Sequence, residues 1–234
     1  MGGRNLKKIL LMGNPNVGKS VVFSRLTGVN VIQSNYPGTT VGYTKGHLLL
    51  DNTEMELVDV PGTYSLSPSC KAEEVARDMF FEENPELIIN VLDATNLERN
   101  LYLTLQILEK GIPTVLVLNM WDSAKRKGVH VNLEKLQKIM GINVVTAVAV
   151  TGEGIKELVN VMAEMTKNPD RDISKIPKMD DDDKWACIGQ ILSKVQKIEH
   201  RHPSLLEKLE DASVRPISGI IIAIIVLFVT MQVV

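Results

Sequence analysis

The chain has 234 residues, of which 44% are hydrophobic, and carries a formal net charge of −2. This length suits one medium domain with a small extension and excludes two full-size globular domains, while the near-neutral charge gives no electrostatic case for binding nucleic acid. The two cysteines, Cys70 and Cys187, have neither CxxC nor CxxH spacing, which argues against a disulfide framework and a zinc site and favours the reducing cytosol.

Strand and helix patterns alternate along residues 1–168. Apolar runs predict strands at 7–12, 47–51, 54–59, 87–92, 113–119 and 143–148. Helical periodicity predicts helices at 19–27, 71–83, 98–110, 132–140 and 153–166. This alternation predicts an α/β fold with a mostly parallel sheet flanked by helices on both faces. Two stretches without strong periodicity, 28–44 and 60–70, are expected to be irregular loops that move.

A complete phosphate-binding motif follows the first predicted strand. Residues 13–20 read GNPNVGKS, the GxxxxGK[ST] pattern, and a predicted helix comes directly after them. Gly13 and Gly18 let the backbone N–H groups point inward at phosphate oxygens, beside the N-terminus of that helix. Lys19 is expected to reach the β- and γ-phosphates, and the Ser20 hydroxyl to coordinate Mg²⁺. The alternative, a chance match in a glycine turn, is disfavoured by the strand before and the helix after.

A second motif, DVPG at residues 59–62, directly follows the predicted strand 54–59. Asp59 is therefore expected at the carboxyl end of a strand, where an aspartate can reach a phosphate-bound Mg²⁺ through a water molecule. A DxPG motif alone is weak support, so the assignment of Asp59 depends on the phosphate loop upstream.

A third motif, NMWD at residues 119–122, has the N-x-x-D form of a guanine-specificity loop. Asp122 can accept hydrogen bonds from N1–H and the 2-amino group of guanine, whereas adenine offers no such pair of donors. The expected ligand is therefore GTP rather than ATP. Met120 replaces the usual lysine and is expected to lie along the face of the base. The alternative is that Asn119 and Asp122 are ordinary turn residues after a strand.

The character of the sequence changes after the predicted α/β domain. Residues 169–215 are expected to form a linker and a short helical regulatory segment, with helices at 185–200 and 204–212. The acidic run at 180–183 is interpreted as a solvated linker with helix N-terminal charge, with a cation site as the alternative. Residues 216–234 carry no charge and would be about 28 Å long as a helix, so they are predicted to span a lipid bilayer. A buried element of the soluble domain is the alternative.

Five segments together resemble the amino-terminal part of the ferrous iron transport protein B family, membrane proteins of bacteria and archaea with a cytosolic GTP-binding domain. The segments are GNPNVGKS at 13–20, NYPGTTV at 35–41, DVPGTYSLS at 59–67, DATNLERNLYLTLQ at 93–106 and LNMWD at 118–122. The block at 93–106 is the most specific, because general GTPases have nothing like it. The resemblance is strong over about residues 4–168 and loose beyond them.

The resemblance implies a P-loop GTPase of the Ras-like type, with residues 1–168 as its GTP-binding domain. Thr40 corresponds to the switch I threonine and would join Ser20 and Asp59 around Mg²⁺, with Thr39 as a less favoured substitute. Asn16 corresponds to a ligand of a stimulating K⁺ ion, which would neutralise the charge that grows between the β- and γ-phosphates in the transition state. Lys19, Thr40 and Asn16 are then the expected catalytic residues.

Two positions depart from the usual GTPase pattern. Thr63 follows Gly62 where many small GTPases carry a water-positioning glutamine, so slow intrinsic hydrolysis is expected, of order 10⁻³ s⁻¹. The base-contacting loop S-A-x aligns with residues 148–150: Ala149 keeps the N–H for guanine O6, but Val148 replaces the serine. This replacement puts the rigidity of the loop, and with it the rate of GDP release, in question.

Taken together, the motifs and the resemblance predict one nucleotide site. Its expected residues are Asn14, Pro15, Asn16, Val17, Gly18, Lys19, Ser20, Val21, Gly38, Thr39, Thr40, Asp59, Gly62, Asn119, Met120, Asp122, Val148, Ala149 and Val150. The expected cofactors are Mg²⁺ and, by resemblance, K⁺.

Three classes of function stay open at this stage. The favoured one is a GTP-binding and GTP-hydrolysing module that gates or drives iron uptake by the permease part of a longer protein, held at the inner membrane by 216–234 with the GTPase in the cytosol. The second is a GTPase switch acting on ribosomes or envelope assembly, and the third a GTP sensor without meaningful turnover. The sequence leaves open whether the chain forms a homo-oligomer.

Overall fold

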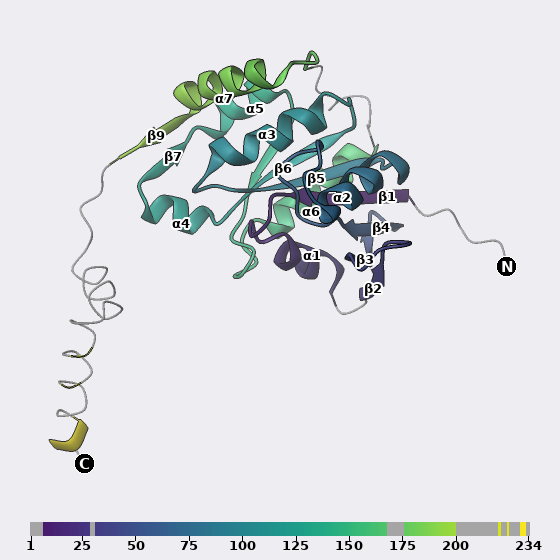
Figure 1. The fold of residues 1–234 in the computed structure, drawn as a ribbon. Coiled ribbons are helices and arrows are strands. Elements are labelled where there is room, and N and C mark those ends of the chain that lie inside the picture. Colours follow the sequence, from purple (N-terminus) through teal and green to yellow (C-terminus); the bar gives the residue numbers. More distant parts are fainter. Residues whose placement is uncertain are drawn as a thin grey trace. The chain divides into compact units, whose positions relative to one another are not determined.

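A seven-stranded sheet lies at the centre of the unit formed by residues 1–198 (Figure 1). The computed structural model describes residues 7–28, 31–167 and 176–199, together with the separate positions 220, 224 and 230–232. The strands of the sheet are β1 (Lys7–Gly13), β2 (Val31–Asn35), β3 (Gly42–Leu50), β4 (Thr53–Asp59), β5 (Leu87–Asp93), β6 (Thr114–Asn119) and β8 (Asn143–Thr146). Residues 199–234 form a second unit, of which position 199 and the separate positions are described.

The sheet is mostly parallel, as the alternation of predicted strands and helices indicates. Its strand order is β2-β3-β4-β1-β5-β6-β8. β1 pairs in parallel with β4 and β5, and β6 pairs in parallel with β5 and β8. β3 is antiparallel to both β2 and β4. β5 and β6 are continuous apolar runs that are buried nearly throughout, which is typical of parallel strands covered on both faces. The predicted α/β class is therefore confirmed.

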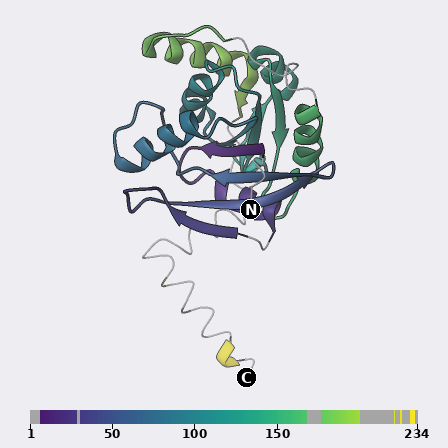
Figure 2. The ribbon, with the colours of Figure 1, turned by 90° about the vertical axis from the view of Figure 1, so that its right-hand side faces the viewer.

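Helices cover both faces of the sheet because side chains along each strand alternate between the faces. The helices around the sheet are α1 (Lys19–Thr27), α2 (Lys71–Glu82), α3 (Leu97–Leu108), α4 (Trp121–Arg126), α5 (Leu133–Met140) and α6 (Ile155–Lys167). On β1, Ile9 and Leu11 belong to the core beneath α1 and α6, whereas Leu10 and Met12 belong to the core beneath α2 and α3. Figure 2 shows α2 and α3 on one side of the sheet and α6 on the other.

The carboxyl ends of the central strands meet at one edge of the sheet. Leu11 on β1 is in register with Asp59, the last residue of β4, and Asp93 on β5 is in register with Asn119 on β6. In open α/β sheets this edge is where ligands bind. The fold thus brings together the three motifs that the sequence places after separate strands.

The lack of periodicity predicts an irregular loop over the whole stretch 28–44, but the structure shows that part of this stretch is regular. It contains β2, and β3 begins at Gly42 instead of position 47. β2 is an edge strand that is mostly exposed and pairs antiparallel with β3, so burial imposes no apolar alternation on its sequence. The stretch 60–70 contains no helix or strand, in agreement with the prediction.

The segment after the sheet differs from its prediction at both ends. Its helix α7 (Asp181–Val195) begins before position 185, because the Asp180 side chain caps it by accepting a hydrogen bond from Asp183 N at 2.8 Å. The acidic run therefore lies at the cap and in the first turn, as helix N-terminal charge. The helix ends before position 200, since β9 (Gln196–Ile198) pairs antiparallel with β7 (Val129–Val131). Neither of these strands, nor α4, was predicted.

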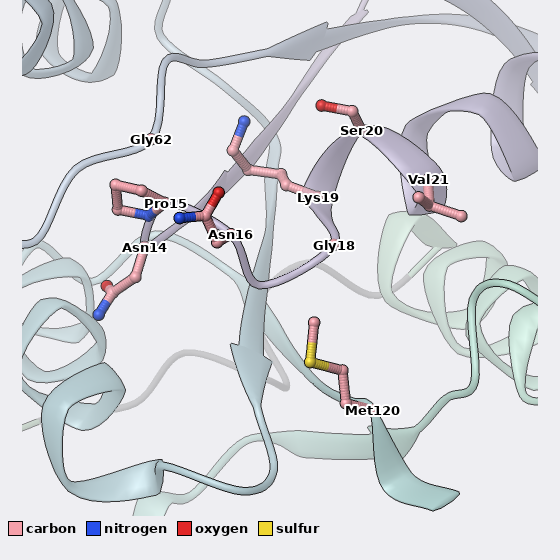
Figure 3. A pocket seen from close by; sticks show the side chains of 9 residues that line it. All are labelled: Asn14, Pro15, Asn16, Gly18, Lys19, Ser20, Val21, Gly62 and Met120. Atoms are coloured by element: carbon pink, nitrogen blue, oxygen red, sulfur yellow. The ribbon is translucent and has the colours of Figure 1, made fainter. Parts of the chain in front are cut away.

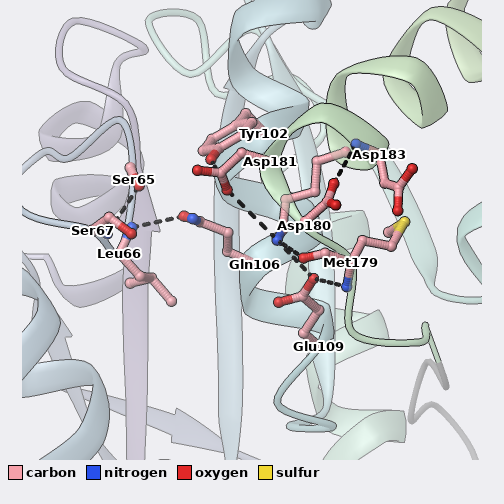
Figure 4. Close-up of polar contacts among 11 residues, drawn as sticks. Ser65, Leu66, Ser67, Tyr102, Gln106, Glu109, Met179, Asp180, Asp181 and Asp183 are labelled. Atoms are coloured by element: carbon pink, nitrogen blue, oxygen red, sulfur yellow. Dashed lines mark hydrogen bonds and ion pairs between the residues drawn. The ribbon is translucent and has the colours of Figure 1, made fainter.

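Helix α7 is anchored on α3 by side chains that the two helices contribute to one cluster (Figure 4). The Trp185 ring stacks on Tyr102 with a centroid distance of 4.9 Å, and the Tyr102 hydroxyl donates to Asp181 Oδ1 at 2.7 Å. Burial and that bond raise the pKa of Tyr102 to about 12. The buried Lys184 lies 3.0 Å from Glu109 Oε1. Residues of 169–215 that the sequence assigned to a linker segment thus pack into the same compact unit as the sheet.

Among the described residues, the helices are all too short or too polar to cross a membrane. The helix expected at 204–212 lies outside the described residues. The span expected at 216–234 also lies outside them, except for the separate positions.

Candidate nucleotide-binding site

The loop between β1 and α1 has a backbone conformation that requires glycine at two positions. Gly13 has φ +151° and Gly18 has φ +85°. A Cβ atom on Gly13 would lie 2.3 Å from the backbone oxygen of Val91, and one on Gly18 would lie 2.2 Å from Asn119 Nδ2. The close approach of the loop to β5 and β6 therefore depends on these two glycines.

A cavity of about 510 Å³ lies over this loop (Figure 3). Such a volume is in the range of small-molecule sites. Its lining residues are Asn14, Pro15, Asn16, Gly18, Lys19, Ser20, Val21, Gly62 and Met120. All of them belong to the set that the sequence predicts for the nucleotide, and they come from the phosphate loop and the residue after it, the DVPG segment and the NMWD segment.

Lys19, Ser20 and Asp59 form a cluster at this edge of the sheet. The Lys19 ammonium group forms an ion pair with the Asp59 carboxylate and donates a hydrogen bond to the backbone oxygen of Val60 at 2.6 Å. The Ser20 hydroxyl donates to Asp59 Oδ2 at 3.3 Å. A hydroxyl and a carboxylate at this separation are oxygen ligands of the kind that Mg²⁺ prefers, so the chemistry of this donor set fits the ion that the GTPase fold implies.

The switch I residues lie apart from that cluster. Thr40 is exposed, and neither it, Thr39 nor Gly38 lines the cavity. Thr39 forms a local turn, because its hydroxyl donates to Tyr36 O at 3.0 Å and accepts from Val41 N at 3.2 Å. The roles of Gly38, Thr39 and Thr40 in binding nucleotide or Mg²⁺ stay predictions.

At the other end of the site, Asn119 connects three segments of the chain. Its side chain is 4% exposed. The amide nitrogen Nδ2 donates to the backbone oxygen of Val17 at 2.9 Å, and Oδ1 accepts from Ala149 N at 3.0 Å. The Ala149 N–H that the sequence assigns to guanine O6 is thus bonded to Asn119 here. Its contact with a base stays a prediction, and Asn119 acts first as a structural tie.

Met120 and Asp122 occupy the start of α4. Met120 has φ 58° and ψ 33°, an uncommon left-handed conformation, and it faces the phosphate loop across the cavity (Figure 3). Asp122 does not line the cavity: it forms a half-exposed ion pair with Arg126 at 3.1 Å. A base seated against Met120 would have to draw Asp122 from this exposed pair, which is worth under about 1 kcal/mol.

Switch II, the stretch 60–70, is held by side chains that no motif identified. The buried Thr63 hydroxyl donates to Ser65 O at 2.6 Å. The Glu73 carboxylate on α2 accepts hydrogen bonds from Tyr64 N at 3.2 Å and from Ser69 N at 2.9 Å. Burial by itself raises the pKa of Glu73, but the hydrogen bonds from Ser69 and Tyr64 outweigh it, so the net effect lowers the pKa of this carboxyl. A glutamate in the first turn of a helix is too common to have signalled this role.

Arg25, in the last turn of α1, was also missed. Its guanidinium group donates to the backbone oxygens of Ala149, at 3.0 Å from Nε, and of Val150. The phosphate-loop pattern ends at Ser20, so nothing in the sequence connects Arg25 with a loop more than a hundred positions away.

Sequence comparisons match the chain to one protein family and to several of its members. The profile of the family described as ferrous iron transport protein B matches residues 7–162. A Fe(2+) transport protein A/Fe(2+) transporter FeoB fusion protein of Porphyromonas gingivalis is 40% identical over 170 residues, which is 72% of this chain and 20% of that protein. The Fe(2+) transporter FeoB of Leptospira biflexa is 40% identical over 159 residues, or 68% of this chain and 23% of the relative. The chain thus spans about a fifth of the length of the curated relatives it matches.

Solved structures agree with this relationship. The cytosolic domain of L. pneumophila FeoB has a TM-score of 0.75 at 30% identity, with 82% of this chain and all of that chain covered. A mutant of S. thermophilus NFeoB bound to GDP has a TM-score of 0.65 at 38% identity, covering 80% of this chain and 71% of the other. The T. maritima FeoB cytosolic domain in GMPPNP form has a TM-score of 0.71 at 27% identity, covering 82% and 100%. The chain has the P-loop GTPase fold and belongs to the ferrous iron transport protein B family.

Proposed function

We propose that the chain is the GTP-hydrolysing module of a ferrous iron transporter, and that its nucleotide state gates or drives iron uptake through the membrane part of that protein. The observation that carries this proposal is the cavity over Gly13–Ser20, lined by phosphate-loop side chains and closed by Met120 from the base-specificity motif. Family membership and the names of the relatives support iron as the cargo and make a role on ribosomes or in envelope assembly the less favoured alternative.

Within the site, the chain's own residues would divide the work. Backbone N–H groups of the phosphate loop would hold phosphate oxygens at the N-terminus of α1. Lys19 would turn from Asp59 toward the β- and γ-phosphates, which leaves Asp59 and Ser20 free to hold Mg²⁺. The bound Mg²⁺ supplies neutralisation of the phosphate charge. Asn16, exposed with φ 66°, lines the cavity and offers an amide oxygen to K⁺.

Hydrolysis by this site should be slow without a stimulating ion or partner. The buried Thr63 hydroxyl is already bonded to Ser65 O, so it is held inside the protein instead of facing a nucleophilic water. Water would then be oriented by backbone groups, and the expected intrinsic rate is of order 10⁻³ s⁻¹. A K⁺ ion at Asn16 would raise this rate by stabilising charge in the transition state.

The membrane part of the proposal assigns a place to each part of the chain. Residues 216–234 would form a span in the inner membrane, with residues 1–168 in the cytosol as the GTPase and 169–215 as the connection between them. The permease part of the longer protein would be the partner of the nucleotide switch.

Three experiments test the proposal, two on the isolated chain and one in cells. Calorimetry of the chain with Mg²⁺ should show heat on adding GDP and none on adding ADP; equal heat with both would overturn the assignment of the nucleotide. Phosphate release from GTP should be faster in K⁺ than in Na⁺ buffer. In cells that depend on the transporter containing this chain, Lys19→Ala should reduce iron uptake, and an unchanged uptake rate would contradict the link to transport.

A further inference from the structure

The guanidinium group of Arg25 spans the backbone of the base-contacting loop. Nε donates to Ala149 O at 3.0 Å, and a terminal nitrogen donates to Val150 O. The group also lies beside Gly152, where an added Cβ would be 3.8 Å from Arg25 Cζ. Two adjacent carbonyls are thus bridged by one planar fork, in which two separate nitrogens of the arginine each donate to one carbonyl; lysine has a single nitrogen and no such fork.

The rest of this loop is held mainly by its own residues. Val148 N donates to Glu153 O at 3.1 Å, and the Thr151 hydroxyl donates to Val148 O at 3.0 Å. The Val150 side chain is 75% exposed and contributes little packing. Side chains from outside the loop hold it at Ala149. Asn119 Oδ1 accepts a hydrogen bond from the Ala149 N–H, and Arg25 donates one to the Ala149 carbonyl.

Arg25 lies on the same helix as the phosphate-binding residues. α1 begins with Lys19 and Ser20, and Arg25 follows in its last turn. A helix is stiff over this length, so the Arg25 contacts fix the base-contacting loop relative to the phosphate loop. The Arg25 contacts thereby hold the loop in place of the serine that Val148 replaces.

We infer that Arg25 is a positioning residue that orders the loop 148–152 against α1 and so sets the lifetime of bound guanine nucleotide. This inference rests on the proposed function, because it requires a base to be seated between Met120 and this loop. An ordered loop loses less conformational entropy when the nucleotide binds. Its hydrogen bonds to Arg25 would have to break before the loop could move away and release the base. Loss of the anchor should therefore act mainly on the dissociation rate.

The test is the release of a fluorescent GDP analogue from the intact chain, followed by stopped flow with excess unlabelled GDP. Arg25→Gln, which removes the bridging fork, should release the analogue roughly 10-fold faster, since two charge-assisted hydrogen bonds are lost at a partly exposed site. The association rate should change less than about twofold. Arg25→Lys, which keeps the charge but replaces the fork by a single nitrogen, should give an intermediate rate.

Arg77→Gln on α2 is the matched control. Arg77 is a partly exposed helical arginine paired with Asp78, and neither lines the cavity. This variant should leave release unchanged. Hydrogen exchange of the nucleotide-free protein should show faster exchange at the amides of 148–152 in Arg25→Gln and not in Arg77→Gln.

The outcomes separate the inference from the proposed function. If the unmodified chain does not bind the GDP analogue, the proposed function fails. If it binds and Arg25→Gln releases it at the unmodified rate, the inference alone is overturned. Release from Arg25→Lys at the unmodified rate would contradict the role of the fork, while a graded series with unchanged association supports it.

Discussion

The phosphate end and the base end of the site lie on the same edge of the sheet but are built in different ways. At the phosphate end, Gly13 and Gly18 shape a loop that follows its sequence motif throughout. At the base end, Met120 and Val148 replace the usual residues, and the loop is held by Asn119 and Arg25 from other elements. A loop whose shape is set by its own glycines keeps its geometry wherever the motif occurs. A loop whose usual motif residues are replaced depends on side chains from distant parts of the chain.

The largest expected effect comes from removing the Lys19 ammonium group at the phosphate end. Lys19→Ala should weaken GDP binding roughly 100-fold, about 3 kcal/mol, because charge-assisted bonds to phosphate oxygens are lost in a partly buried site. Calorimetry with GDP and Mg²⁺ measures this change. Lys138→Ala on α5, an exposed lysine outside the cavity, is the control. Unchanged affinity in Lys19→Ala would show that backbone amides suffice.

At the base end, Asp122→Asn should alter which base is bound. The amide cannot accept from both guanine donors, so GDP affinity should fall roughly 30-fold, about 2 kcal/mol. Xanthosine diphosphate carries an oxygen in place of the 2-amino group and should bind the variant better than it binds the unmodified chain. Competition against a fluorescent GDP analogue measures both. If GDP and xanthosine diphosphate keep their original order, Asp122 does not read the base.

A third change tests the side chain that holds the stretch 60–70, which contributes Gly62 to the cavity. Glu73→Gln should lower the free energy of unfolding at pH 7 by about 1–2 kcal/mol, since the buried Glu73 carboxylate accepts hydrogen bonds from Tyr64 and Ser69. The pKa of Glu73 is lowered in the folded state, so its stabilisation is present above the unfolded pKa and is lost as the pH falls through the folded pKa. Urea unfolding of both proteins from pH 7 downward should show the difference shrinking in acid. A constant difference at all pH values would contradict this.

The smallest effect is expected from restoring the usual lysine. Met120→Lys adds charge to a stem of similar length at the cavity wall, so GDP affinity should rise about threefold, or roughly 0.6 kcal/mol. Binding measured at two salt concentrations should show the gain shrinking at high salt, because the added charge is partly exposed. A loss of affinity would mean that the left-handed backbone at Met120 is tuned to the methionine side chain.

Much of the fold was predictable where burial imposes a pattern. The apolar runs of β1, β5 and β6 gave these strands nearly their observed bounds, because strands covered on both faces must be apolar. β2 and β9 were missed, since an exposed edge strand and a short pairing with β7 leave no such pattern. The residues lining the cavity all belong to the set predicted for the nucleotide, because all but Val21 lie in motifs whose spacing carries the chemistry and Val21 directly follows one of them.

By itself, the sequence determined the phosphate loop, the mostly parallel sheet and the family, because local spacing and burial patterns are written into consecutive residues. The tertiary structure alone decided that Arg25 bridges the carbonyls of Ala149 and Val150, that Asn119 bonds Ala149 N–H, and that α7 docks on α3. Each of these contacts joins residues that lie far apart along the chain. Their partners are chosen by the geometry of packed elements, which no local pattern contains.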